Sequence, residues 1–138
     1  MQGKYTDAEA WWDKARAEAI AGFGERDAHL AVVTSGLAEV FRLAGGHKFA
    51  AAEPLLRETV ALTQQEYGEA DVRAAHARQL LGQYLSEAGQ HKAAVAELEA
   101  AAAAKKKVLG KGHVDYAAVR PLLLQIPYTL APLKFGKL

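Results

Sequence analysis

The five histidines could supply metal ligands: His29, His47, His76, His91 and His113. A metal site on one helix commonly places two histidines one turn apart, so that both rings reach the same ion. No pair has that spacing, and the five fall in turns or on different predicted helices. We therefore assign them to turns and to the surface, and we predict no metal ion and no other cofactor.

Phosphate binding and nucleophilic catalysis each have one weak candidate. The segment G-K-G-H from Gly110 lacks the Ser or Thr that follows the lysine of a phosphate loop, and it also lacks the upstream glycine. Ser35 precedes Gly36 in the middle of a predicted helix with no strand before it, which excludes a nucleophile elbow. No two carboxylates stand out as an acid–base pair. The sequence therefore predicts no catalytic residue, and we expect that the protein is not an enzyme.

Three consecutive lysines, Lys105, Lys106 and Lys107, could form a basic patch. They come at the end of a predicted helix, where positive charge interacts favourably with the helix dipole. We interpret them as a solvated helix end. The whole chain has 17 Lys and Arg against 16 Asp and Glu, a formal charge of +1. That balance does not favour nucleic acid or an acidic membrane surface as a partner.

Composition and length indicate one globular domain. The chain has 138 residues, of which 51% are hydrophobic and 24% charged, and it contains no cysteine. No apolar run approaches the roughly 20 residues that cross a bilayer, and the first thirty residues lack a signal pattern. We expect a soluble intracellular protein without membrane insertion, in the cytoplasm or inside an organelle, and the sequence does not distinguish these compartments.

Aspartates and glycines recur at a fixed spacing and mark the helices that would position any functional site. Asp27, Asp71 and Asp115 stand 44 residues apart, and Gly24, Gly68 and Gly112 keep the same spacing three residues earlier. A period of this length is typical of repeat proteins. An aspartate at each step can cap a helix by accepting the free N–H groups of its first turn.

Hydrophobic periodicity predicts six helices, over residues 6–23, 27–44, 49–67, 71–88, 92–109 and 115–124. Thr6 and Glu9 have the spacing of a capping box. Pro54 falls in the first two turns of the third helix and predicts a late start or a mild kink there. Ala94 and Ala101 are expected to be buried where helices cross. Glycines should end the helices, at Gly24, Gly45, Gly68, Gly89 and Gly110.

The fourth and fifth stretches resemble the tetratricopeptide repeat signature through Leu81, Gly82, Leu85, Gly89, Ala94, Leu98 and Ala101. The same pattern recurs upstream. The segments K-F-A-A-A-E-P-L-L at 48–56 and L-G-K-G-H-V-D-Y-A at 109–117 resemble the longer repeat of kinesin light chains. The resemblance implies an all-α array of helical hairpins wound into a right-handed superhelix. We assign residues 1–125 to this domain and residues 126–138 to an extended apolar C-terminal tail.

The chain departs from the family pattern at its ends. The first predicted helix is the second half of a repeat, and the last is a first half, with no polar capping helix at either end. Trp11 and Trp12 lie on the opening helix, and at least one should face the place where a preceding helix would pack. We expect either a longer array or other subunits that cover these ends.

In the family, the inner groove is lined by side chains of the first helix of each repeat. Transferred position by position, the resemblance implies a groove formed by Val32, Ser35, Glu39 and Arg42, then His76, Gln79, Gln83 and Ser86, extended by Arg120 and Leu123. This lining is nearly neutral and lacks the Lys, Arg and Asn cluster that clamps a C-terminal carboxylate in some relatives. A receptor for chaperone tails is therefore disfavoured. The plain alternative is that these side chains are only hydrated.

The tail cannot form a continuous helix, because Pro127 and Pro132 interrupt it. It is nevertheless too apolar for a solvated segment, as Tyr128, Leu130, Leu133 and Phe135 show. Folding back on its own chain and docking on another protein are equally compatible with this composition.

Two functions remain. The first is a non-catalytic scaffold or adaptor for protein–protein interaction, a subunit or fragment of a larger assembly. The second is a peptide-binding module that works alone. Both imply protein partners, with no nucleic acid. The tryptophans, the groove residues and the tail are the predicted contacts.

Overall fold

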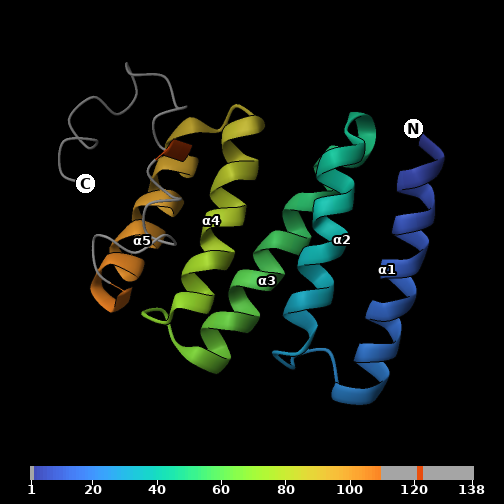
Figure 1. Ribbon diagram of the computed structural model, residues 1–138, viewed down its shortest axis with the longest axis horizontal. Helices are drawn as coiled ribbons and strands as arrows, with labels where there is room; N and C mark the ends of the chain where they lie inside the picture. Colours follow the sequence, from blue (N-terminus) through green and yellow to red (C-terminus); the bar gives the residue numbers. More distant parts are fainter. Residues whose placement is uncertain (1, 110–120, 123–138) are drawn as a thin grey trace. The chain divides into compact units, whose positions relative to one another are not determined.

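The computed structural model describes residues 2–109 and 121–122, and these are almost entirely helical (Figure 1). The elements are α1 (Gln2–Phe23), α2 (Leu30–Ala44), the 3-10 helix η1 (Gly46–Ala51), α3 (Ala52–Tyr67), α4 (Val72–Glu87) and α5 (His91–Leu109). No strand occurs in this part of the chain. The prediction of an all-α helical hairpin fold is confirmed. Of the sixth predicted helix only Pro121 and Leu122 are described, both helical, and the tail lies outside the described residues.

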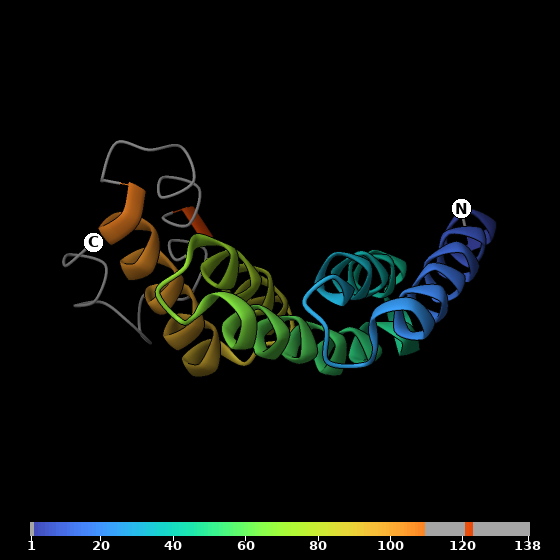
Figure 2. The same cartoon turned by 90° about the horizontal axis from the view of Figure 1, so that it is seen from below.

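The chain divides into two compact units, Met1–Glu66 and Tyr67–Leu138. In the first unit α1 and α3 both lie beside α2 (Figure 1 and Figure 2). Leu30 and Ala31 of α2 and Leu62 of α3 form a buried cluster there, and Ile20 of α1 packs against it. The right-handed winding of successive hairpins stays a prediction.

Trp12 of α1 packs directly on Gly36 of α2. A Cβ atom built on Gly36 would lie 2.5 Å from the Trp12 ring, far inside van der Waals contact. Because Gly36 has no side chain, the Trp12 indole can occupy this space.

In the second unit, a glycine likewise makes room for a large side chain within the hairpin α4–α5. A Cβ on Gly82 of α4 would lie 2.7 Å from Leu98 of α5. Ala94 and Ala101 of α5 have no exposed surface, as predicted for a helix crossing. Small residues thus bring the two helices close together.

Glycine ends the helices as predicted. Gly24, Gly45, Gly68 and Gly89 all have positive φ, a conformation that costs glycine little. The fifth predicted stop, Gly110, lies beyond the described part of the chain.

The start of α3 agrees with the position of Pro54. The α-helix begins only at Ala52, after η1, so Pro54 is its third residue. A missing N–H costs little in the first turn, because those groups have no intrahelical acceptor. The expected late start is therefore observed.

Asp71 caps α4 as predicted. It has extended backbone angles and accepts the Arg73 N–H at 2.8 Å. Its carboxylate also accepts from Arg73 Nε at 2.9 Å, and the Arg73 guanidinium stacks 3.5 Å over the Tyr67 ring. These hydrogen bonds to the Arg73 side chain, and then to its N–H, lower the pKa of Asp71.

Asp27 departs from the prediction, because α2 begins at Leu30 with His29 as its N-cap. Asp27 still accepts the His29 N–H, at 2.9 Å. However, the Leu30 N–H bonds back to the Asp27 carbonyl at 3.0 Å, which makes an i+3 turn before the helix. The predicted helix start at residue 27 is therefore wrong by one tight turn.

The capping box at Thr6 and Glu9 is also wrong. The helix α1 already begins at Gln2, so Thr6 lies inside it. Glu9 instead accepts a hydrogen bond from Lys48 Nζ in η1. The Glu9 carboxylate is therefore bound by a residue distant in sequence and does not cap its own helix.

Lys105 is not part of a solvated helix end. It is 2% exposed and its ammonium donates to Gln79 Oε1 of α4. Lys106 and Lys107 are exposed, so the interpretation holds for these two lysines only.

Candidate protein-binding surfaces

The predicted groove residues of α2 share one helix face. Val32, Ser35, Glu39 and Arg42 are three or four residues apart, and Val32 is 71% exposed. Arg42 Nε donates to Glu39 Oε2 at 2.9 Å, so the two charges on this face are paired. Ser35 Oγ donates to the Val32 carbonyl at 2.9 Å. The face therefore offers an exposed apolar side chain beside a neutralised ion pair.

The predicted groove residues of α4 also share one face. His76 is exposed, while Gln83 and Ser86 are partly buried. Gln79 accepts the hydrogen bond from Lys105. Gln79 thus holds a buried ammonium of α5, a contact within the hairpin that the sequence did not reveal.

The two tryptophans differ in environment. Trp11 is 63% exposed, whereas Trp12 is half-buried on Gly36. Their rings meet edge to face with centroids 4.8 Å apart. Trp11 is therefore the indole accessible to a partner, and Trp12 packs against the protein's own helix.

Six predicted contact residues fall outside the described part of the chain: Arg120, Leu123, Tyr128, Leu130, Leu133 and Phe135. Their role stays a prediction.

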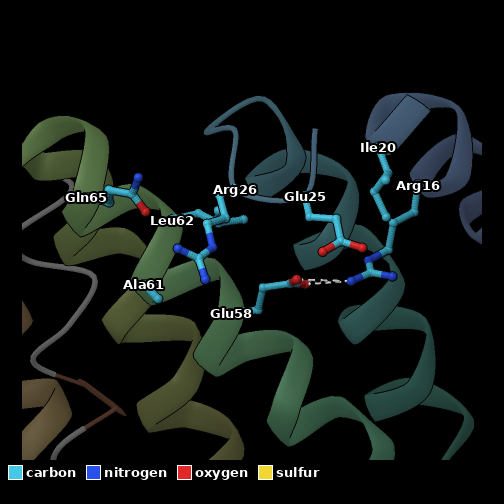
Figure 3. A pocket seen from close by; sticks show the side chains of 8 residues that line it. All are labelled: Arg16, Ile20, Glu25, Arg26, Glu58, Ala61, Leu62 and Gln65. Carbon is cyan, nitrogen blue, oxygen red and sulfur yellow. Dashed lines mark hydrogen bonds and ion pairs between the residues drawn. The ribbon is translucent and has the colours of Figure 1, made fainter. Parts of the chain in front are cut away.

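A cleft that the sequence did not predict lies between α1 and α3 (Figure 3). Its volume is about 470 Å³. Arg16 and Ile20 contribute from α1, Glu25 and Arg26 from the following loop, and Glu58, Ala61, Leu62 and Gln65 from α3. Arg16 Nη2 donates to both carboxylate oxygens of Glu58, at 3.0 and 2.9 Å. The 42-residue separation of Arg16 and Glu58, close to the repeat length, was the one available sequence signal.

A smaller hollow of about 260 Å³ lies at the opposite end of α1. It is lined by Tyr5, Thr6 and Glu9 and by the residues from Ala44 to Lys48. The contact between Glu9 and Lys48 joins its two sides.

Among residues 2–109 and 121–122, no group of three or more His, Asp or Glu side chains could hold a metal ion. None of the described helices has the length and hydropathy needed to cross a membrane.

Comparison with known families gives one finding. Residues 74–115 match the tetratricopeptide repeat family, and this range includes most of α4 and all of α5. The recognised similarity to tetratricopeptide repeats, of the kinesin light chain-like type, is thereby confirmed. No curated protein matches the chain.

Proposed function

Since residues 74–115 match the tetratricopeptide repeat family, we propose that this protein is a non-catalytic scaffold or adaptor within a larger assembly. Tetratricopeptide repeats generally mediate protein–protein interaction and generally lack catalysis. We propose proteins or extended peptides as partners, and neither nucleic acid nor the membrane. The near-neutral net charge of +1 supports that choice.

The match over the hairpin α4–α5 is the observation that carries the proposal. Leu81 and Leu98 are buried, and Leu98 packs on Gly82 of α4, so the hairpin uses apolar surface for its own packing. Repeat proteins bind partners on the extended concave surface that stacked hairpins form.

Exposed apolar side chains in the first unit support the same function. Trp11 and Val32 are 63% and 71% exposed on regular helices. Tryptophan side chains contribute much of the binding energy in many protein interfaces, which supports Trp11 as an anchor.

A stand-alone peptide-binding module is the second candidate. The α2 face favours it, because a neutralised Glu39–Arg42 pair beside Val32 suits the backbone and apolar side chains of an extended peptide. Size-exclusion chromatography with light scattering separates the two candidates. A well-behaved monomer favours the module, while association with a copurifying subunit favours the assembly.

Affinity purification with quantitative mass spectrometry tests the proposed function directly. We expect the wild-type chain to retain partner proteins. The recovered amount of these partners should fall about tenfold or more with Trp11→Ala or Val32→Glu. Val108→Glu is the matched control, since Val108 is also exposed, at 56%, but lies near the end of α5. Equal recovery by all four proteins would refute a role for these faces.

A further inference from the structure

The cleft between α1 and α3 is separate from the α2 face. Its lining comes from α1, the following loop and α3, and includes none of the residues predicted for the groove. It therefore goes beyond the proposed function and can be tested independently.

Charge in the cleft is unevenly distributed. Glu58 is held by Arg16, and Figure 3 shows the Glu25 carboxylate turned toward the same arginine. Among the residues that the structure describes, the buried Arg16 Nε has no hydrogen-bond acceptor, so Arg16 still attracts a second carboxylate. Glu58 is thus paired with Arg16, and the Glu25 carboxylate lies on the same side of the cleft.

Arg26 is the second positively charged residue of the cleft. Figure 3 shows its guanidinium extending into the cleft from the loop after α1. It forms no ion pair with another residue of the described chain. A guanidinium presents a planar fork of N–H donors that fits a carboxylate.

Apolar surface adjoins this guanidinium. Ile20 and Ala61 line the cleft, and Leu62 connects its floor to the buried cluster of the first unit. Cavities of several hundred Å³ with an apolar floor and a few polar groups are typical of binding sites. The volume of about 470 Å³ accommodates two neighbouring side chains of a peptide.

We propose that this cleft binds an extended segment of a partner protein in which Asp or Glu stands beside an aliphatic residue. The carboxylate pairs with Arg26, and the aliphatic side chain packs on Ile20 and Leu62. The Arg26 guanidinium favours an acidic ligand over a basic one, because Glu58 of the cleft is already held by Arg16.

The test uses the full chain and an array of 12-residue peptides on random backgrounds. Each peptide carries a central Glu-Leu, Lys-Leu or Glu-Ser pair. We expect the chain to retain Glu-Leu peptides over both other classes. Fluorescence polarisation with a retained peptide should then show binding weakened about tenfold or more by Arg26→Glu.

Two further variants sharpen the test. Ala61→Glu adds a carboxylate to the cleft on an exposed helical position, and should also weaken binding about tenfold without loss of helix. Arg57→Glu is the control, because Arg57 lies on α3 outside the cleft and is 53% exposed. Circular dichroism verifies that each variant is folded.

Several results would overturn the proposal. Retention of Lys-Leu peptides, retention of none, or equal binding by Arg26→Glu and the wild-type chain each would do so. Binding that is lost with Val32→Glu but not with Arg26→Glu would place the peptide on the α2 face. That outcome would refute the cleft and leave the proposed function standing.

Discussion

At the scale of single residues, two glycines determine which large side chains reach the helix contacts. Gly36 receives Trp12, and Gly82 receives Leu98. Steps of 44 and then 42 residues lead from Trp12 through Leu56 to Leu98, so both large residues hold the same place in the predicted repeat pattern. A tryptophan and a leucine thus fill equivalent positions, each over a glycine.

Replacement of Gly36 by alanine should destabilise the first unit. The new Cβ would stand 2.5 Å from the Trp12 ring and force the indole away, at a cost of about 1–3 kcal/mol. Gly22→Ala is the matched control, because a Cβ on Gly22 in α1 would meet nothing within 4 Å. That change should be neutral or stabilise by up to about 1 kcal/mol. Urea unfolding of both variants measures the difference, and equal midpoints would show that the Trp12 contact is wrong.

Asp71 should make stability depend on acid. Its folded pKa lies below the ordinary 3.8 because Arg73 bonds to the charged carboxylate. A lowered folded pKa means that the ionised form stabilises the fold above 3.8, and that this contribution is lost as the pH falls through the folded pKa. Urea midpoints measured from neutral pH to below 3.8 should therefore fall, and fall less in Asp71→Asn.

The asparagine variant keeps an oxygen that can accept the Arg73 N–H but carries no charge. Asp71→Ala removes the cap altogether and should cost about 0.5–2 kcal/mol at neutral pH. An identical acid dependence in the wild-type chain and in Asp71→Asn would exclude Asp71 as its source.

At the scale of elements, the helices were predictable because their signals are local. Apolar periodicity and the glycines at 24, 45, 68 and 89 are read directly from neighbouring residues. The same holds for Pro54 near the start of α3. These features need no knowledge of distant partners.

The starts of α2 and α4 show which features local sequence signals do not predict. Asp27 and Asp71 each accept the N–H of the second residue after them. After Asp71 the chain closes an i+4 bond from the Ala75 N–H, but after Asp27 it closes an i+3 bond from Leu30. The spacing predicts the aspartate and its first hydrogen bond, but it does not predict the register of the next turn.

Polar contacts between side chains distant in sequence were not predictable. The cleft depends on Arg16 and Glu58, and the environment of Lys105 depends on Gln79. The helix dipole predicts a solvated position for Lys105 at the end of α5, because the dipole takes no account of the neighbouring helix α4. The face residues of α2 and α4 were found through the family resemblance, and their role as partner contacts stays a prediction.

Replacement of Ala94 by leucine tests the crossing of α4 and α5. Ala94 has no exposed surface, and its carbonyl lies near Gly82, so a larger side chain should overpack the contact by about 1–3 kcal/mol. Ala96→Leu adds the same atoms at an exposed position of α5 and serves as the control. Thermal melts of the two variants should differ, and a melt of Ala94→Leu like that of the wild-type chain would show the register to be wrong.

At the scale of the whole molecule, we expect the apolar tail to take part in association. Deletion of residues 126–138 should leave helical content nearly intact and abolish binding to the native partner, because its apolar residues are costly to expose to water. Circular dichroism and pull-down of the truncated chain measure the two effects. Retained binding would contradict the proposal, and a joint loss of helix and binding would identify the tail as an internal cap.

The placement of both tryptophans in the first unit makes the chain its own optical reporter. The sequence contains two tryptophans, both before residue 66, so indole emission follows Met1–Glu66 while far-ultraviolet dichroism follows all helices. In Trp11→Phe the remaining indole, Trp12 over Gly36, is a single fluorophore at the α1–α2 contact. Coincident unfolding curves from the two signals would mean that the two units melt as one cooperative system, and separated curves would mean that the first unit unfolds independently of the second.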